Sequence, residues 1–336
     1  MNWNKGFSAE YYACFVDPVT WENLERFEIL SGSIKRTDSG LRHSADIECT
    51  DYNQSLERWI RIYLDAKQSD GSAAHVPLFT GLVSAPQANI NGKKKSNSLT
   101  CYSVLKAAED VYLPLGFYAS EGINGAMQVK VLLETVIPSN IEIIGTSPAL
   151  SKYIVADNGE TYLSMAEKIL DTINWRLKLH GDGNIEICAI ASEPSLMFDP
   201  LNNDSVKPEI KVINDWFKCP NVFRGTFENE SVTVIDDNIN SPLSTVNRGR
   251  EVWFEEKDCK LSETETLKEY VQRRLKEEQR NNFTVSYSHR FFPDVYPSDL
   301  VELRYPEHGL DGLFYISNQS FSLAYGAEIN EEVVQV

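Results

Sequence analysis

The side chains of this sequence that could support catalysis are carboxylates and clustered aromatic rings. Glycoside hydrolysis needs two paired carboxylates, one of which acts as a general acid. Two pairs are close in sequence, Glu48 with Asp51 and Asp236 with Asp237, but 49 acidic residues supply such pairs by chance. Six aromatic residues could form a sugar platform, although core packing is their commoner role: Trp216, Phe217, Tyr287, Phe291, Phe292 and Tyr296. We therefore predict no catalytic residue and no enzymatic activity.

Histidines and cysteines also lack the spacing of a metal site. The histidines are His43, His75, His180, His289 and His308, and the cysteines are Cys14, Cys49, Cys101, Cys188, Cys219 and Cys259. No C-x-x-C, H-E-x-x-H, G-x-S-x-G, Walker A or G-x-G-x-x-G pattern occurs. Most of the histidines lie beside predicted turns or strand ends, where a surface histidine is common, and we expect the cysteines to be reduced structural residues of a protein made in the cytosol. No metal and no cofactor are predicted.

The charge of the chain argues against nucleic-acid binding. Asp and Glu total 49 against 32 Lys and Arg, which gives a net charge of -17. Gripping DNA by counterion release needs a basic surface, so we expect no specific nucleic-acid binding. An acidic surface favours solubility, and it would suit a channel wall that lets a polyanion pass. No apolar run approaches the ~18 residues of a membrane helix, and the first residues lack the apolar core of a signal peptide.

Two segments far apart in the sequence predict similar β-hairpins. Residues 59–84 contain an alternating strand, an Asp-Gly tip and an aromatic and aliphatic return strand, and residues 300–317 repeat this order. Each hairpin is followed by another alternating strand, at 87–90 and at 319–323. The repeat indicates a part that presents the same shape twice. Any two hairpins share some of these features, so coincidence stays open at this point.

The length of 336 residues indicates two or three domains. Short strands predict a first β-barrel module over residues 1-112, and residues 113-208 predict a middle α+β domain. Residues 209-336 predict a second β-barrel module with a charged helix at about 262-280, while the 236-261 segment could instead pack on the middle domain. The fold class is therefore α+β, mainly β, with two similar modules flanking a small α+β domain.

Three helices follow from caps and periodicity. Asn124-Gly125 precedes a helix to about residue 136, which stops before Pro138. A second helix has one apolar face and is expected to pack on a hairpin at 175–187; that face is Leu163, Ala166, Ile169, Leu170 and Ile173. Ser262 and Glu265 have the spacing of a capping box and would open the charged helix.

Several ordered motifs resemble the baseplate hub family of contractile phage tails, the late control protein D and XkdQ-like group. They are residues 154–162 leading to 175–183, the segment Asn240–Ser244 with Asn247–Arg250, and residues 292–301 after the charged helix. Ser298 stands where that family usually has glycine in a P-G-D-x-V turn. The resemblance extends from about residue 25 to the end of the chain.

The resemblance implies a structural hub of a phage tail or tail-like particle, built as a homotrimer with two tube-like barrels in each subunit. Three subunits would then present six similar modules to the sixfold tail tube and a threefold surface to the central spike. Expected partners are the tail tube protein, the spike and other baseplate proteins. The expected location is the virion baseplate, with synthesis in the bacterial cytoplasm.

Two alternatives remain at this point. The chain could be the amino-terminal hub-like domain of a tail-associated lysin, although such proteins usually continue into an enzymatic or fibre region and this sequence stops at Val336. A different class is a carbohydrate-binding or carbohydrate-processing β protein that uses exposed aromatic rings.

Overall fold

The computed structural model of the chain describes residues 1–50, 52, 53, 55–199, 205–257, 259, 261, 265–280 and 283–335. Strands dominate these residues and helices are few and short, so the prediction of a mainly β, α+β fold is confirmed. No helix in the described part of the chain is long and apolar enough to cross a membrane.

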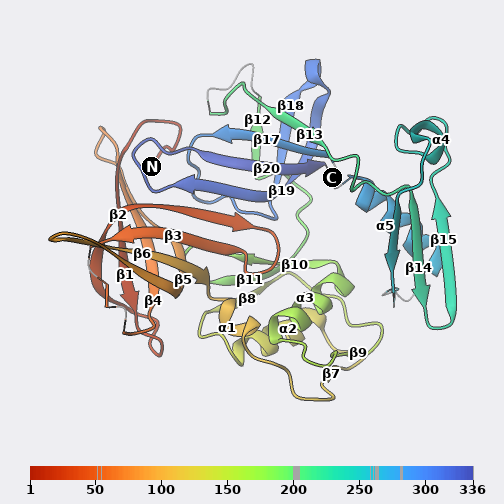
Figure 1. Cartoon of the computed structure of the whole chain (residues 1–336), viewed down its shortest axis with the longest axis horizontal. Helices are drawn as coiled ribbons and strands as arrows, with labels where there is room; N and C mark the ends of the chain where they lie inside the picture. Colours follow the sequence, from red (N-terminus) through yellow and green to blue (C-terminus); the bar gives the residue numbers. More distant parts are fainter. Residues whose placement is uncertain are drawn as a thin grey trace.

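The first module is a closed ring of six strands (Figure 1). The strand order is β1-β4-β5-β6-β3-β2, and β2 pairs back with β1. Alternating residues point inward and form one core, as the period of two requires. The strands are β1 (Ser8–Val16), β2 (Asn23–Thr37), β3 (His43–Cys49), β4 (Trp59–Lys67), β5 (Ala73–Asn91) and β6 (Lys94–Ser103).

The second module repeats this strand order. Its strands are β12 (Leu196–Phe198), β13 (Lys211–Asn214), β17 (Phe283–His289), β18 (Leu300–Tyr305), β19 (Leu310–Ser322) and β20 (Ile329–Gln335), with the 3-10 turn η1 (Pro306–His308) between β18 and β19. They pair in the order β12-β18-β19-β20-β17-β13, so both modules follow the pattern 1-4-5-6-3-2 when their strands are counted along the chain. The predicted hairpins, β4–β5 and β18–β19, therefore occupy the same place in the two modules.

The modules differ at their ends. Strand β1 is antiparallel to β4, whereas β12 is parallel to β18. No pairing joins β12 to β13 among the described residues, so a closed ring of strands is seen in the first module and not in this part of the second. Strand β12 also precedes residue 208, where the sequence suggested that the second module begins.

One strand contact joins the two modules into a continuous sheet. The last part of β2 pairs antiparallel with the last part of β19, from Ser33 opposite Ser322 to Thr37 opposite Asn318. Ile34 and Phe321 face each other in this junction and both are buried. Leu323 follows β19 and packs in the core of the first module. The two modules therefore share apolar packing as well as backbone pairing.

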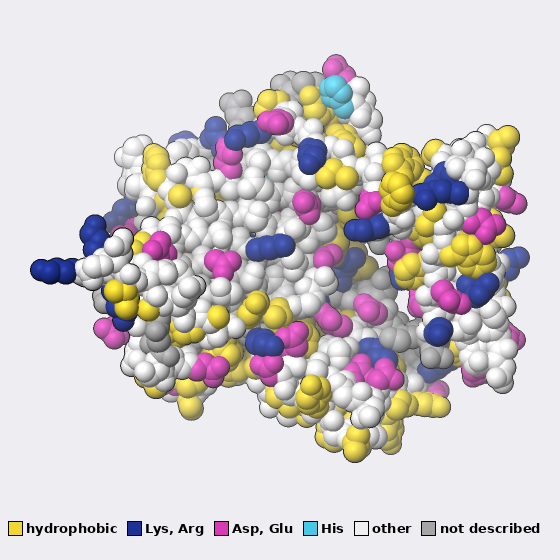
Figure 2. Space-filling view, viewed as in Figure 1, with side chains coloured by type: hydrophobic (Ala, Val, Ile, Leu, Met, Phe, Trp, Pro, Cys, Tyr) yellow, Lys and Arg dark blue, Asp and Glu magenta, His cyan; other side chains and the backbone are white. Residues whose placement is uncertain are grey.

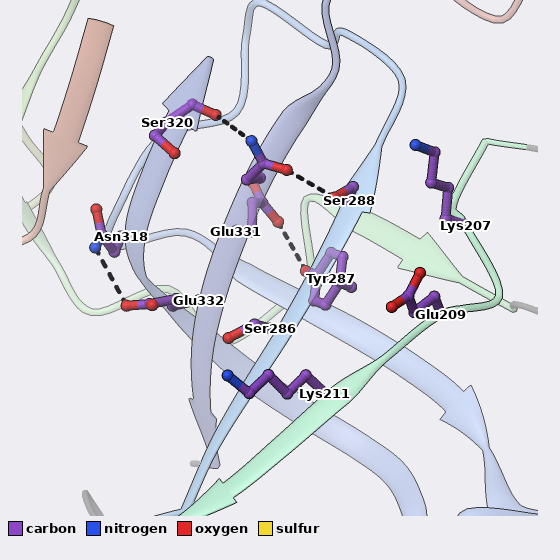
Figure 3. A pocket seen from close by; sticks show the side chains of 11 residues that line it. Lys207, Glu209, Lys211, Ser286, Tyr287, Ser288, Asn318, Ser320, Glu331 and Glu332 are labelled. Atoms are coloured by element: carbon purple, nitrogen blue, oxygen red, sulfur yellow. Dashed lines mark hydrogen bonds between the residues drawn. The ribbon is translucent and has the colours of Figure 1, made fainter.

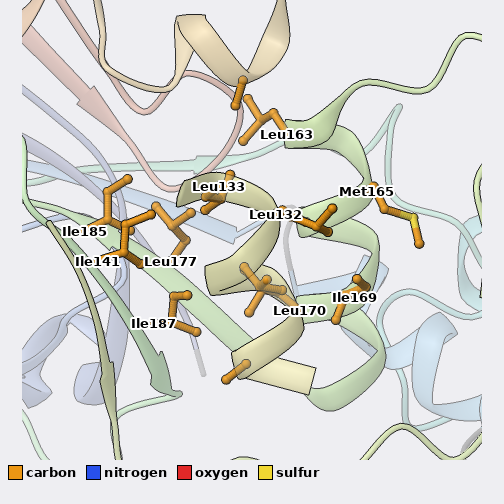
Figure 4. Packing of buried hydrophobic residues seen from close by; sticks show 14 of the residues in the cluster. Leu132, Leu133, Ile141, Leu163, Met165, Ile169, Leu170, Leu177, Ile185 and Ile187 are labelled. Atoms are coloured by element: carbon orange, nitrogen blue, oxygen red, sulfur yellow. The ribbon is translucent and has the colours of Figure 1, made fainter. Parts of the chain in front are cut away.

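The middle domain packs two helices on a three-stranded sheet (Figure 4). Its elements are α1 (Lys106–Glu109), β7 (Tyr118–Ala119), α2 (Gly125–Glu134), β8 (Ile141–Ile144), β9 (Ile154–Val155), α3 (Tyr162–Ile173), β10 (Trp175–Leu179) and β11 (Ile185–Ala189). Asn124 caps α2 through the Met127 amide, and Thr161 with Ser164 forms a capping box on α3. Leu163, Ala166, Ile169, Leu170 and Ile173 are all buried, which confirms the predicted face of the helix.

A small unit lies between β13 and β17 in the chain and stands at the right of Figure 1. Strand β14 pairs with β15 and with β16, and α5 covers this sheet with its own core. The 236–261 segment therefore contributes β16 to this unit. Lys152 of the middle domain lies over the Phe227 ring of the same unit. The elements are β14 (Val222–Phe227), β15 (Glu230–Ile235), α4 (Thr245–Arg248), β16 (Trp253–Glu256) and α5 (Leu267–Arg280).

The charged helix begins later than its sequence suggested. Ser262 lies outside the described residues, and α5 starts at Leu267. Thr266 and Glu269 cap it reciprocally, since the Glu269 carboxylate accepts from the Thr266 amide and the Thr266 hydroxyl accepts from the Glu269 amide. Glu265 instead pairs with Arg273 at 2.9 Å. A second capping pair four residues downstream thus sets the start of the helix.

Candidate functional surface

The outer face of the joined sheet carries small polar side chains rather than a catalytic cluster. The face spans β6, β3, β2, β19, β20 and β17, which are hydrogen-bonded in that order. We call the following set the polar face: Ser96, Ser98, Thr100, Ser44, Asp46, Glu48, Ser31, Ser33, Lys35, Asn318, Ser320, Ser322, Asn330, Glu332, Ser286 and Ser288. None of these residues is buried. Figure 2 shows few hydrophobic side chains over these strands.

Strand register aligns these residues in rows that cross both modules. Residues directly opposite each other in an antiparallel pair share one face of the sheet. One row runs unbroken across six strands: Tyr102, Ser44, Lys35, Ser320, Asn330 and Ser288. The row passes from the first module to the second at Lys35 and Ser320, so the junction between β2 and β19 makes the two outer faces one surface.

Side-chain hydrogen bonds between neighbouring strands fix the orientation of residues on the polar face. Thr100 donates to the Asp46 carboxylate at 2.8 Å, and Ser96 donates to Glu48 at 2.7 Å. In the second module, the Ser288 hydroxyl donates to the Asn330 side-chain oxygen at 2.7 Å. The charged members of the face are three carboxylates and one lysine, which gives a small excess of negative charge.

A shallow groove lies on the second-module part of this surface (Figure 3). Its walls come from β13, β17, β20 and β19 together with the segment before β13, and they include Lys207, Glu209, Lys211 and Glu332. The groove is open and mostly polar, and its cations are balanced by carboxylates. It is suited to polar surface contacts rather than to enclosure of a small substrate.

A buried polar cluster supports the sheet under this groove. Glu331 and His289 are both almost fully buried, with the Glu331 carboxylate 3.1 Å from the His289 ring nitrogen. Tyr287 donates to Glu331 at 2.7 Å and Gln319 donates to its other oxygen. Burial alone would raise the pKa of Glu331, but His289 and the donated hydrogen bonds hold that pKa below its ordinary value. The cluster ties β17, β19 and β20 together.

A second buried polar group joins the first module to the middle domain and the second module. The Arg36 guanidinium donates to the Leu78 carbonyl and lies over the Tyr296 ring, 4.5 Å from its centre. His43 stacks on the same ring, and His180 meets it edge-on. Burial, together with the charge of Arg36, holds the pKa of His43 well below its ordinary value.

Backbone contact fixes the middle domain beneath β5. The Gly181 carbonyl accepts from the Thr80 hydroxyl at 2.9 Å, and a Cβ at Gly181 would overlap the Pro77 carbonyl. Lys178 of β10 pairs with Asp299, just before β18, at 2.7 Å. The middle domain therefore contacts both modules and lies below them in the view of Figure 1, and in the same view Figure 2 shows the face over β2, β3, β19 and β20 uncovered.

The structure describes three of the four carboxylates considered in the sequence, Glu48, Asp236 and Asp237, and the last of these is exposed. Asp51 lies outside the described residues, and Glu48 accepts hydrogen bonds from Ser31 and Ser96 on the polar face. Asp236 accepts from Ser241 and Gln279 in the small unit. Both carboxylates thus organise local structure.

The aromatic residues divide between core and surface. Tyr287, Phe291 and Tyr296 are buried, and Phe292 packs against the second core. Trp216 and Phe217 are exposed, and they lie next to β13. No platform containing all six rings exists, since four of them pack inside.

Two of the five histidines are exceptions to the expected surface position. His43 and His289 are buried, although each lies at a strand end as predicted. In the described residues, no group of three His, Cys, Asp or Glu side chains could hold a metal ion.

The polar face itself was missed by sequence reasoning, but its signal was present as the alternating Ser and Thr of 96–100 and the Ser residues of 286–288.

No family model matches this sequence, and no curated protein matches it. Solved structures do resemble its fold. A tail protein from Neisseria meningitidis MC58 has a TM-score of 0.69 at 14% identity and covers 97% of each chain. The 43 kDa tail protein of prophage MuSo2 from Shewanella oneidensis has a TM-score of 0.67 at 15% identity and covers 98% of each chain.

A component of the type VI secretion system from Escherichia coli is also similar, with a TM-score of 0.55 at 9% identity; the match covers 92% of this chain and 74% of that one. At these identities the likeness establishes the fold. The chain has the fold of phage tail proteins over almost its whole length, which confirms the resemblance at that level.

Proposed function

We propose that the chain is a structural protein of a phage tail or phage-tail-like particle and forms its baseplate hub. The observation that carries this proposal is the repetition of one six-stranded order in two modules that share a sheet. A subunit that presents the same module twice can connect a sixfold ring to a threefold one when three copies assemble.

In this proposal the chain is a homotrimer, and its partners are the tail tube protein, the central spike and other baseplate proteins. Its location is the baseplate, reached after synthesis in the bacterial cytoplasm. It performs no catalysis and binds no specific nucleic acid. The proposed domains are 1-112, 113-208 and 209-336, with two differences: β12 pairs within the second module, and β14 to α5 form a small unit of their own.

The polar face would line the passage through the ring. Small hydroxyl and amide side chains, with three carboxylates and Lys35 as the charged members of the polar face, give an exiting polyanion no cluster of cations to bind. This lining differs from the acidic channel wall that the sequence suggested, because the face is mainly neutral and polar with a small excess of carboxylates.

Sedimentation of the purified chain across a salt series tests the assembly. The net charge of -17 makes subunits repel, so we expect the trimer to gain population as salt screens that repulsion. A trimer that dissociates as salt rises would instead be held by ion pairs. A stable dimer, or a chain that degrades peptidoglycan through a single carboxylate, would contradict the proposed function.

A further inference from the structure

Two strand edges of the chain lack a partner strand among the described residues, and they are the counterparts of the two edges that join the modules. In the first module, residues 85–91 of β5 pair with β6 on one side only. In the second module, β13 pairs with β17 on one side only. By strand order, β5 corresponds to β19 and β13 corresponds to β2, and β19 and β2 form the junction.

The register extends this correspondence to single residues. Leu82 of β5 faces Tyr102 of β6, and Tyr315 of β19 faces Val334 of β20. In the first module Tyr102 pairs with Ser44, and Ser44 pairs with Lys35. In the second module Val334 pairs with Thr284, and Thr284 pairs with Ile213. Ile213 is therefore the counterpart of Lys35, and Gln87 is the counterpart of Ser320, which faces Lys35 in the junction.

We propose that these two edges pair with each other between two copies of the chain, so that β13 of one copy extends the sheet of the next copy at β5. The inference rests on the proposed function, since it supplies the contact by which hub subunits form a ring. The register copied from the junction places Gln87 opposite Ile213, Ala88 opposite Val212 and Asn89 opposite Lys211.

Exposed apolar residues at both edges favour contact with a partner strand over contact with solvent. Leu323 is 7% exposed because it packs across the junction, whereas its counterpart Ile90 is 73% exposed. Val212 is 42% exposed and is the counterpart of buried Ile34. Pairing between copies would cover Ile90 and Val212 as the junction covers Leu323 and Ile34, which adds apolar burial to backbone pairing.

Pro86 is compatible with this pairing. It lies inside the ladder between β5 and β6, opposite Leu99, so its nitrogen faces the free edge, where a missing N–H does not break that ladder. Its carbonyl still faces the edge and can accept. The two edges belong to different strands, so the contact is head-to-tail, the kind that forms a ring when the rotation between copies closes.

A disulfide placed across the edges tests the register. Asn89 and Lys211 correspond to Ser322 and Ser33 in the junction. Leu323 is hydrogen-bonded to Gly32, and Ser317 to Asp38. Because hydrogen-bonded and non-hydrogen-bonded pairs alternate along an antiparallel ladder, Ser322 and Ser33 form a non-hydrogen-bonded pair. Such non-hydrogen-bonded pairs have Cα atoms about 4.5 Å apart, within disulfide range. The full chain carrying Asn89→Cys and Lys211→Cys should oxidise to a covalent trimer that reduction reverses. Each single variant, and the out-of-register pair Asn89→Cys with Ile213→Cys, should not.

The outcomes separate this inference from the proposed function. A trimer by mass that does not cross-link at these positions overturns the edge pairing and leaves the hub role standing. A chain that is monomeric at every concentration and salt, with no cross-linked product, overturns both.

A surface variant provides a second readout. Ile90→Asp should weaken association about 10- to 100-fold while leaving the melting temperature of the monomer unchanged, because Ile90 is already exposed there. Val19→Asp is the matched control, since Val19 is 87% exposed and lies in a turn away from both edges. Equal association of the two variants would contradict the pairing.

Discussion

Ser84 and Ser317 are the extra residues of two β-bulges at the same position of the two modules. Ser84 follows Val83 in β5, and the pairing with β6 skips it. Ser317 follows Ile316 in β19, and the pairing with β20 skips it in the same way. Each serine lies two residues after the one that faces the first residue of the preceding strand. The modules thus share a local irregularity as well as a strand order, which points to one architecture used twice.

Deleting Ser317 should leave the second module folded but without its bulge. Ile316 and Asn318 pair with the consecutive residues Val333 and Glu332, so loss of the extra residue restores a regular alternation and keeps Phe321 in the core and Ser320 on the polar face. We expect a cooperative unfolding transition, measured by circular dichroism during urea denaturation, with a free energy of unfolding lowered by about 0.5–3 kcal/mol. Loss of the cooperative transition would contradict this reading of the bulge. Ser317→Ala keeps the bulge and should change the free energy of unfolding by less than about 0.5 kcal/mol.

Replacing Leu170 with Ala should destabilise the middle domain by about 2–5 kcal/mol, because the side chain is 2% exposed between α3 and the sheet. Val131→Ala on α2 is the control, since Val131 is 52% exposed. Urea denaturation measures both. A loss below about 1 kcal/mol for Leu170→Ala would contradict the packing described here.

Gly181→Ala should destabilise the chain by about 1–3 kcal/mol, because the added Cβ meets the backbone of Pro77 and Leu78 where the middle domain contacts β5. Gly6→Ala is the control, since nothing lies within 4 Å of its added Cβ. Thermal unfolding compares the two variants. Similar melting temperatures would show that the backbone shifts to accommodate the added Cβ without loss of stability.

Stability should fall as the pH drops below about 6.5, the ordinary range of histidine. His43 has a folded-state pKa well below that value because it is buried beside Arg36. The unfolded chain therefore binds a proton that the folded chain does not, which costs up to about 1.4 kcal/mol per pH unit. Urea denaturation at pH 7.5, 6.5 and 5.5 should show a smaller decline for His43→Gln. His308→Gln, at an exposed site, should retain the decline of the parent chain.

The hairpin repeat and the helix of the middle domain could be predicted because their signals are local. Asp70-Gly71 marks the tip of the first hairpin, and one apolar face from Leu163 to Ile173 marks the helix. In the second hairpin the predicted turn was misplaced, because Asp311 and Gly312 pair inside β19 and the chain turns at η1 and Gly309. The start of α5 was misplaced because two capping patterns occur four residues apart, and only contacts in the folded chain distinguish Thr266 from Ser262.

The junction and the free edges could not be read from sequence. Pairing of β2 with β19 brings together residues almost 290 positions apart, Ser33 and Ser322, and no local pattern encodes such a partner. The burial of His43 and His289 depends on the same long-range packing. The small unit of β14 to α5 was missed as a separate body because its strands are short and interrupted by turns.

Electron cryo-microscopy of the assembled chain tests the central claim most directly. We expect a threefold ring of six similar modules, with the two modules of each chain related by a rotation of about 60° around the axis. The row of Lys35 and Ser320 should face the channel, and β13 of each copy should lie beside β5 of the next. A ring with the polar face turned outward, or an assembly in which the two modules of one chain do not alternate around a common axis, would contradict the account.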